Sequence, residues 1–279
     1  VLLGAIAPGA WAYFRLTAAA AILLTVWVLR RGAGVAPGDL ARLAGFAFFG
    51  VVLNQICFIE GLSRTTPAHS ALINTTIPVL TILFAVVLGK ERLRRATAMG
   101  ILLAMAGVLV LLQLDDLEWR AEWFAGDLLT QLNAASFSFF LVISKDTIRR
   151  VGSFPSTVAI LCFGSLGVAL YGGRDAAAFD PAVFTPGLWA IAAYIVLFPT
   201  VFAYFLNYWA LARVESSQVA LFVYLQPILA ATLSVMFLGE EITGRLLVSS
   251  GLVFLGVLFA TRDLGGSSAP RGPSGRGGA

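Results

Sequence analysis

Charged residues are scarce in this chain of 279 residues. They make up 12% of the sequence, whereas a soluble domain carries roughly 25%. Hydrophobic residues make up 59%, and they occur in long blocks rather than in the one-sided stripes of a soluble amphipathic helix. So little charge excludes a water-facing surface, and blocks of about 20 apolar residues match the hydrocarbon thickness of a bilayer. The sequence therefore predicts an integral membrane protein.

The residues on which most hydrolytic chemistry depends are also nearly absent. There is one histidine, His69, and the two cysteines, Cys57 and Cys162, lie in separate apolar blocks. Neither an HExxH nor a GxSxG motif occurs, and the single pair Asp115-Asp116 falls short of the two facing Asp-rich motifs that a prenyl-transfer enzyme needs. The sequence therefore indicates that the protein is not an enzyme, and it predicts no metal site and no cofactor.

Breaks at charged residues, proline and glycine divide the apolar sequence into nine predicted transmembrane spans. Continuous apolar blocks without period-two alternation favour helices over the strands of a membrane barrel. The spans are Pro8–Leu29, Leu40–Leu62, Ala68–Leu88, Ala96–Leu112, Leu128–Ser144, Thr157–Tyr171, Leu188–Ala212, Gln218–Leu238 and Leu246–Thr261.

The basic residues are unevenly distributed between the loops of this nine-span arrangement. Fourteen of the 19 Lys and Arg residues fall on one side, Arg15 lies within a span, and the other side holds only Arg64, Arg120, Arg174 and Arg245. By the positive-inside rule the first side is cytoplasmic, which places the C-terminus in the cytoplasm and the first residue outside. Basic charge placed in this way controls topology and does not form a nucleic-acid-binding surface. We expect a multi-pass protein of a bacterial-type inner (plasma) membrane.

The chain resembles itself at an offset of 149 residues. The overlay pairs Pro78 with Pro227 and Glu91 with Glu240, among 12 identities over 48 positions without a gap. Glu91 falls in a predicted cytoplasmic loop and Glu240 in an outer one, so the second copy is inverted and each copy has an odd number of helices. The sequence therefore predicts an all-α, ten-helix inverted 5+5 repeat whose first helix is largely absent from this chain. Many secondary transporters have such an architecture.

Each half carries a proline followed by "LGKE" or "LGEE" and then a glycine-bearing final helix. Together with "GLSRTTPAHSALINTTIP", "YWALARVESSQVALFVYLQP" and "GDLLTQLNAASFSFFLVISK", this pattern resembles the EamA family of the drug/metabolite transporter superfamily. The resemblance extends from Pro8 to Thr261 and implies a ten-helix carrier of small metabolites, often an exporter. It divides the chain into a first EamA repeat at 1–113, which lacks its first helix, a second EamA repeat at 126–262, and a disordered low-complexity tail at 263–279. The absent helix leaves one wall of a central cavity unseen.

Polar residues inside the predicted spans are the candidates for substrate binding, because an intramembrane polar group usually faces a cavity or a partner helix. Pro78 and Pro227 are expected to kink their helices near mid-membrane, since proline lacks an N–H and clashes with the preceding turn. Polar side chains precede both kinks, which brings hydrogen-bonding groups to one depth. The candidates are Arg15, Asn54, Gln55, Asn74, Thr75, Gln131, Asn133, Tyr204, Asn207, Tyr224 and Gln226.

Each candidate has a structural alternative. An amide or hydroxyl can make an interhelical hydrogen bond of about 0.6–2 kcal/mol instead of touching substrate, and a transmembrane proline can simply shape packing. Arg15 lies about 10 Å deep at 1.5 Å per residue. It could pair with a substrate carboxylate, or it could snorkel to the outer surface or bind neighbouring carbonyls.

Four further features are interpreted as structural. They are Glu91 and Glu240 in contact with the start of the following helix or with loop amides, His69 in packing or capping rather than proton relay, Trp119 and Trp123 on a short interfacial helix, and Gly100 with Ala104 at a helix contact.

The absence of Asp and Glu near mid-membrane favours facilitated transport or exchange over proton exchange through a central carboxylate, unless the missing helix carries one. We expect a carrier, an exporter or facilitator, of small organic metabolites such as amino acids or related amphipathic solutes, which works by alternating access around a midplane cavity. The alternatives are a lipid flippase or scramblase and a proton-coupled drug efflux carrier. The expected partners are a small-molecule substrate and the lipid bilayer, without nucleic acid, and the protein is expected to be a monomer or weak homodimer.

Overall fold

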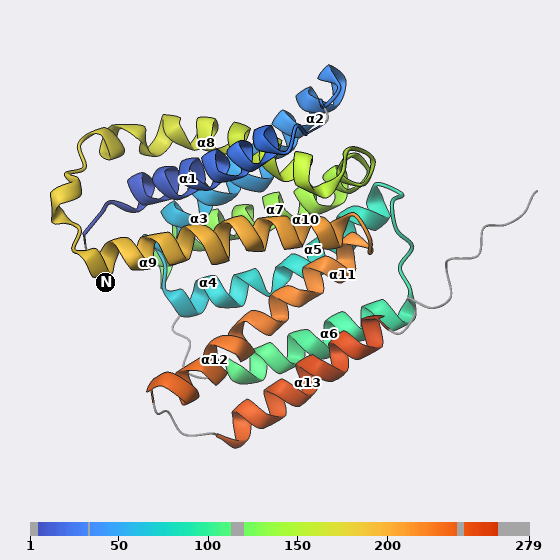
Figure 1. The fold of residues 1–279 in the computed structure, drawn as a ribbon. Coiled ribbons are helices and arrows are strands. Elements are labelled where there is room, and N and C mark those ends of the chain that lie inside the picture. Colours follow the sequence, from blue (N-terminus) through green and yellow to red (C-terminus); the bar gives the residue numbers. More distant parts are fainter. Residues whose placement is uncertain (1–4, 33, 113–119, 239–242, 262–279) are drawn as a thin grey trace, which may run out of the picture.

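The computed structural model describes residues 5–32, 34–112, 120–238 and 243–261, and this part of the chain is helical without any strand (Figure 1). The predictions for Asp115-Asp116, Trp119, Glu240 and the tail at 263–279 lie outside the described residues. The helices are α1 (Pro8–Leu29), α2 (Pro37–Ala47), α3 (Asn54–Leu62), α4 (Pro67–Asn74), α5 (Thr76–Val87), α6 (Arg95–Leu111), α7 (Phe124–Val151), α8 (Ser153–Ala177), α9 (Pro186–Val196), α10 (Ala203–Leu211), α11 (Ser216–Leu221), α12 (Leu225–Leu238) and α13 (Gly244–Thr261).

Short segments of other helix types join several of these helices. Two are π-helical, η2 (Phe48–Leu53) and η6 (Leu197–Phe202). Three are 3₁₀ turns, η4 (Ala121–Trp123), η5 (Pro181–Val183) and η7 (Phe222–Tyr224).

Seven continuous helical runs among the described residues are long and apolar enough to cross a membrane. They are Pro8–Leu29, Pro37–Leu62, Pro67–Val87, Ala121–Val151, Ser153–Ala177, Pro186–Leu211 and Ser216–Leu233, and two shorter apolar helices cover Arg95–Leu111 and Gly244–Ala260. All nine predicted spans therefore coincide with helix. Large apolar side chains face outward, with Leu170 92% and Val87 73% exposed, a surface that suits lipid rather than water. The chain is a multi-pass membrane protein.

Proline marks the start of four helical runs. Pro8, Pro37, Pro67 and Pro186 each stand in the first turn of their helix, where the missing N–H costs nothing because that group has no intrahelical acceptor. The fifth and sixth spans are longer than their apolar blocks, since α7 continues through charged residues to Val151 and α8 begins at Ser153.

The helix boundaries recur along the chain. The run α2–η2–α3 covers 37–47, 48–53 and 54–62, and the run α9–η6–α10 covers 186–196, 197–202 and 203–211. Every one of these boundaries differs by 149 residues, the offset of the sequence overlay. Helix α13 begins 149 residues after α6 in the same way. The two halves of the sequence thus fold into matching series of helices, π-helical segments included.

Two pairs of helices pack closely on opposite sides of the molecule, α1 with α8 and α6 with α13 (Figure 1). In the second pair, Gly100 approaches Gly256 while Gly107 approaches Ser249, so the helices run antiparallel. A Cβ added at Gly100 would lie 2.5 Å from the Gly256 carbonyl oxygen, and one at Gly256 would lie 2.6 Å from the amide nitrogen of Ala104. The prediction that Gly100 and Ala104 form a helix contact is therefore confirmed.

Gly256→Ala is expected to destabilise the protein by about 1–3 kcal/mol, because the methyl group must displace the backbone of α6. Gly251→Ala is the matched control on the same helix, since its Cβ would meet nothing within 4 Å. Alanine at the control position should be neutral or stabilising by up to about 1 kcal/mol. Thermal unfolding of the two purified variants in detergent gives the comparison, and equal midpoints would contradict the close contact.

Candidate functional site

The two proline-bearing helices are interrupted just before their prolines. Helix α4 ends at Asn74, and α5 carries Pro78 as its third residue; likewise η7 ends at Tyr224, and α12 carries Pro227 as its third residue. A proline removes the donor for the carbonyl four residues earlier, which explains why the break precedes it. The predicted kinks thus correspond to breaks in the preceding turn.

Tyr224 crosses from one break to the other. Its hydroxyl is buried and donates to the Thr75 carbonyl oxygen at 2.8 Å. The Tyr224 hydroxyl therefore joins the two broken helices.

A cavity of about 380 Å³, here called the arginine cavity, lies between α1 and α3. Arg15 donates to the Gln55 side-chain oxygen at 3.0 Å and to the Thr200 hydroxyl of η6 at 3.4 Å. Its Nε is buried without a hydrogen-bond partner. The walls include Pro8 and Ser63 near the ends of their helices, so the cavity extends from that end of the bundle inward to Arg15. It is lined by Pro8, Trp11, Ala12, Arg15, Gln55, Phe58, Ile59, Leu62 and Ser63.

A second cavity of about 240 Å³, the amide cavity, shares Gln55 and Phe58 with the first. It is lined by Asn54, Gln55, Phe58, Asn74, Ile77, Asn133, Phe137, Val223 and Gln226. Asn54 donates to the Asn133 side-chain oxygen at 2.5 Å, and Asn133 donates to that of Asn74 at 3.4 Å. Residues of α3, α4 and α7 thus form a chain of amides along one wall.

Residues 149 positions apart meet at this site. Gln55 donates to the Tyr204 hydroxyl at 3.4 Å, and Tyr224 donates to the Thr75 carbonyl. The amide cavity is lined by two further pairs at the same offset, which are Asn74 with Val223 and Ile77 with Gln226.

The remaining candidates are distributed differently. Asn74, Thr75, Tyr224, Gln226 and Pro227 line a cavity of about 250 Å³ beside the two helix breaks. Gln131 hydrogen-bonds Thr76 at 3.3 Å and lines a separate hollow with Asp127. Asn207 lines none of these hollows, and its side-chain oxygen is buried without a hydrogen-bond partner. The structure therefore groups Arg15, Asn54, Gln55, Asn74, Asn133 and Gln226 around two adjoining cavities, with Tyr204 bonded to them.

The apolar walls were not among the predicted site residues. Trp11 lies one helical turn before Arg15, and Phe58 lies three residues after Gln55, so both share a helix face with a predicted polar residue. Helical spacing from Arg15 and Gln55 was the signal that could have identified them.

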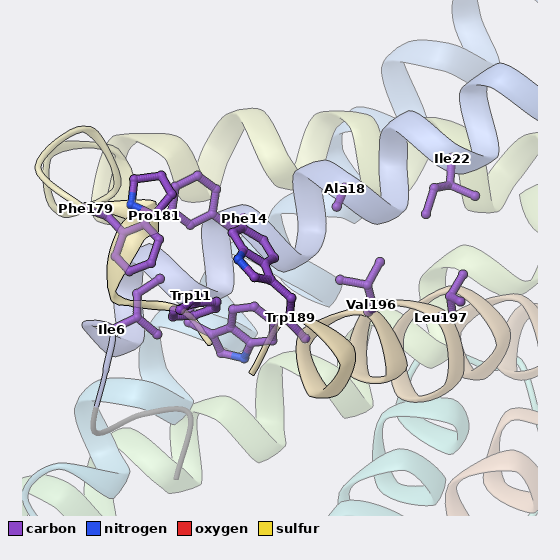
Figure 2. Close-up of a pocket in the computed structure, with 13 residues that line it drawn as sticks. Ile6, Trp11, Phe14, Ala18, Ile22, Phe179, Pro181, Trp189, Val196 and Leu197 are labelled. Atoms are coloured by element: carbon purple, nitrogen blue, oxygen red, sulfur yellow. The ribbon is translucent and has the colours of Figure 1, made fainter. Parts of the chain in front are cut away.

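A larger apolar pocket of about 450 Å³ lies between α1 and α9 (Figure 2). Its walls are aromatic and aliphatic, with Phe14, Phe179, Phe184 and Trp189 among them, and no charged residue lines it. Trp11 lines both this pocket and the arginine cavity. No residue of the predicted polar set lies here, so the pocket offers apolar contact only.

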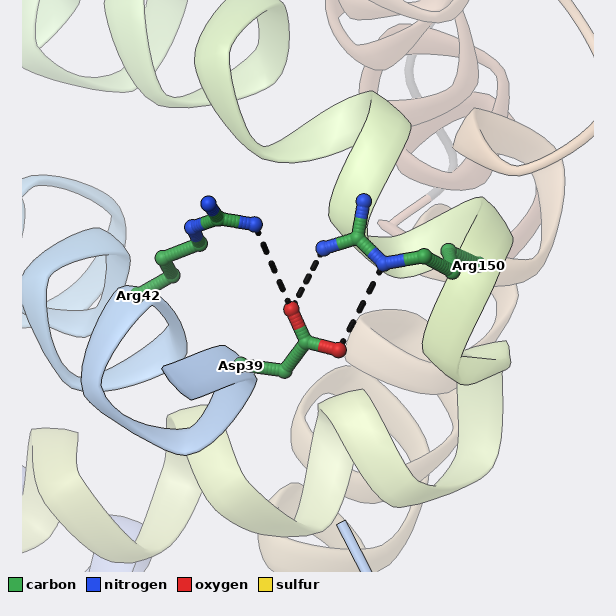
Figure 3. Close-up of polar contacts among 3 residues, drawn as sticks. All are labelled: Asp39, Arg42 and Arg150. Carbon is green, nitrogen blue, oxygen red and sulfur yellow. Dashed lines mark hydrogen bonds and ion pairs between the residues drawn. The ribbon is translucent and has the colours of Figure 1, made fainter. Parts of the chain in front are cut away.

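Ion pairs tie together loops at one end of the bundle. Asp39 at the start of α2 accepts from Arg150 at the end of α7 and from Arg42 (Figure 3). Lys90 pairs with Asp146 at 2.7 Å. Arg42, Lys90 and Arg150 are among the 14 basic residues predicted on the cytoplasmic side, and their contacts at one end of the bundle agree with that prediction. Exposed pairs of this kind contribute about 0–1 kcal/mol each.

Glu91 lies at the same end, and its side chain is buried. Its two carboxylate oxygens accept from the Ser216 backbone N–H and the Ser217 hydroxyl, both at 2.6 Å. Glu91 was predicted to contact the start of the following helix, α6, or loop amides, and it does bond a helix start. The helix is α11 from the other half of the sequence, however, and the positive end of its dipole favours the carboxylate.

His69 lies at the start of α4, where the Thr66 hydroxyl accepts from its backbone N–H at 3.2 Å. Its ring nitrogen Nδ1 lies 3.0 Å from a carboxylate oxygen of Asp127 on α7, and the Thr65 hydroxyl donates to the other carboxylate oxygen. The edge of the Trp123 ring packs on the histidine. The His69 side chain therefore packs as predicted, whereas the residue that caps the helix is Thr66. His69 also has an acidic partner, Asp127, that the sequence did not reveal.

Within the described ranges, no group of three or more His, Cys, Asp and Glu side chains is placed to hold a metal ion. The adjoining cavities instead offer one cation, several neutral amides and aromatic walls. Such a set can orient and desolvate a small solute by hydrogen bonds and ring contacts. The arginine cavity, at about 380 Å³, falls within the range of ordinary ligand pockets, about 300–1,000 Å³.

Comparisons with known proteins agree on the class of molecule. The model of the EamA-like transporter family matches residues 1–113 and 124–262. The chain is 26% identical over 228 residues to the uncharacterized transporter YetK of Bacillus subtilis, which covers 81% of this chain and 69% of YetK. It is also 26% identical over 238 residues to the aromatic amino acid exporter YddG of Ancylobacter novellus, covering 84% and 78% of the two chains. A solved crystal structure superimposes with a TM-score of 0.79 at 23% identity, covering 94% of this chain and 91% of the other.

Proposed function

Because the chain belongs to the EamA-like transporter family, we propose that it carries small organic solutes across the membrane by alternating access around the arginine and amide cavities. Arg15 and Gln55 would bind the polar end of the solute, with Asn54, Asn74, Asn133 and Gln226 as further hydrogen-bonding groups. Trp11 and Phe58 would contact its apolar part.

The observation that carries the proposal is the contact between residues 149 positions apart. In two units related by a two-fold axis, equivalent residues touch only at the axis. The Gln55–Tyr204 and Thr75–Tyr224 hydrogen bonds are such contacts. Gln55 lines the amide cavity, and Thr75 and Tyr224 line the cavity beside the helix breaks. They support a ten-helix inverted 5+5 repeat, with EamA units at 1–113 and 126–262 and the substrate held between them.

The conformation supports one access state. The arginine cavity reaches the end of the bundle at Pro8 and Ser63. At the opposite end Glu91 and Ser216 join the two halves. With the basic loops in the cytoplasm, and with them the C-terminus, this is an outward-open state of a plasma-membrane carrier.

Export is the proposed direction, since the similar protein YddG is an exporter of aromatic amino acids. The contact between the His69 ring and the Asp127 carboxylate, at 3.0 Å, is the observation that favours the proton-coupled alternative. It lies outside the arginine and amide cavities, so we place it second.

Counterflow in proteoliposomes tests the carrier. Each vesicle preparation is loaded with one unlabelled amino acid or organic acid from a panel and should take up the same compound in labelled form, with a rate that saturates. Asn133→Ala should reduce this uptake about 10-fold or more, because it removes two side-chain hydrogen bonds from the amide wall. Leu132→Ala on the same helix is the control, because Leu132 is 45% exposed on the outer surface.

Uptake by neither the wild type nor the control would refute the carrier. A lipid-flip assay in the same vesicles separates the flippase alternative, and acceleration by a pH gradient would favour proton coupling.

A further inference from the structure

The geometry of the arginine cavity points to a narrower substrate class. We propose that the carrier selects solutes with a single negative charge, a carboxylate, on an apolar body, and that Arg15 is the residue that binds the carboxylate. This inference rests on the proposed function, because it concerns the same cavity.

Arg15 is a charge without a counter-ion. Its hydrogen-bond partners are the neutral side chains Gln55 and Thr200, and it forms no ion pair within the described part of the chain. The nearby Glu60 is already engaged by Arg64 at 2.6 Å and by Tyr171 at 2.5 Å. A guanidinium inside a membrane protein is costly unless an anion balances it, so the cavity offers a site for an anion from outside the protein.

The charge of that anion follows from the rest of the lining. Arg15 is the sole charged residue that lines the arginine or the amide cavity in the described part of the chain. A phosphate dianion would therefore be left with one uncompensated charge. The ammonium group of a zwitterion would have no carboxylate to pair with. A monocarboxylate balances the charge of Arg15 without remainder, and a planar guanidinium can bind a carboxylate through two parallel hydrogen bonds.

The body of the solute is defined by the other walls. Trp11, Phe58, Ile59 and Leu62 surround the space beside Arg15. Aromatic and aliphatic walls favour a hydrocarbon or aromatic body.

Three probes with the same body test the inference: 3-phenylpropionate, its neutral amide 3-phenylpropionamide, and zwitterionic phenylalanine. Binding to the purified full chain in detergent is measured by competition, and transport is measured by counterflow in proteoliposomes. We expect 3-phenylpropionate to bind about 10- to 100-fold more tightly than the other two, as a charged hydrogen bond requires.

Arg15→Gln should remove that preference, so that the carboxylate and the amide bind with about the same affinity, whereas Arg15→Lys should retain part of the preference. Arg174→Gln makes the same charge change at an exposed site outside both cavities and is the control. Size-exclusion profiles and thermal midpoints establish that each variant is folded.

Equal affinity for the carboxylate and the amide, no carboxylate binding, or a preference that survives Arg15→Gln would each overturn the inference. Failure of the carrier looks different. Arg15-dependent binding without counterflow would refute transport but support the anion site. Counterflow of another solute that does not depend on Arg15 would support transport but refute the anion site.

Discussion

Replacing Gln55 with glutamate is expected to abolish carboxylate binding while the protein stays folded. The two side chains have the same shape, and the new carboxylate oxygen would take the position that now accepts from Arg15 at 3.0 Å. The internal carboxylate would then balance Arg15, and a second carboxylate would meet like charge in the cavity. Such juxtaposition costs several kcal/mol, so we expect a loss of affinity of about 100-fold or more for 3-phenylpropionate.

The thermal midpoint of this variant separates the two possible roles of Gln55. A new ion pair should maintain or raise the midpoint, so loss of binding cannot be attributed to unfolding. The neutral amide probe should bind the variant as it binds the wild type. Wild-type affinity for the carboxylate in a folded Gln55→Glu protein would show that Arg15 does not bind the solute.

Glu91→Ala is expected to cause the largest loss of stability among these variants. It would remove both acceptors from the start of α11 and leave the Ser216 N–H and the Ser217 hydroxyl buried without partners. Each hydrogen bond to a buried carboxylate contributes about 1.5–3 kcal/mol. Because water and small rearrangements replace part of that contribution, we expect the free energy of unfolding to fall by about 2–4 kcal/mol. For a protein of this size that corresponds to a fall in midpoint of about 5–10 °C.

The control for this prediction is Glu122→Ala, since the Glu122 side chain is 65% exposed. A double-mutant cycle with Ser217→Ala isolates the contact between the two halves. Additive effects of the two substitutions would show that Glu91 and Ser217 do not interact, and an unchanged midpoint in Glu91→Ala would contradict the burial of the carboxylate.

The helices could be predicted from the sequence because a bilayer imposes a simple constraint on them. Nine apolar blocks correspond to nine helical runs, and Pro8 and Leu29 bound α1 as predicted. The offset of 149 residues was visible in the Pro78–Pro227 and Glu91–Glu240 matches. The same offset relates every boundary of α2–η2–α3 to a boundary of α9–η6–α10. No local sequence feature predicted the π-helical segments themselves.

The site was harder to predict than the helices. Intramembrane polar residues of the same type can have different contacts, and the sequence shows the type but not the contacts. Gln55 and Gln131 have the same side chain, yet one lies between Arg15 and Tyr204 and the other bonds Thr76 at a separate hollow. Tyr224 was predicted to bind substrate, and it lines the cavity beside the helix breaks while its hydroxyl bonds the Thr75 carbonyl. Such pairings depend on how helices from the two halves pack, which no single span encodes.

The unbalanced guanidinium of Arg15 also has an electrical consequence. A carrier whose empty site is positive and whose occupied site is neutral moves one negative charge outward with each solute it exports. The usual membrane voltage, negative inside, drives that movement with about 2.3 kcal/mol per 100 mV, which sustains a concentration ratio of roughly 50 at equilibrium. An exporter built in this way would draw on voltage alone, without a co-transported ion.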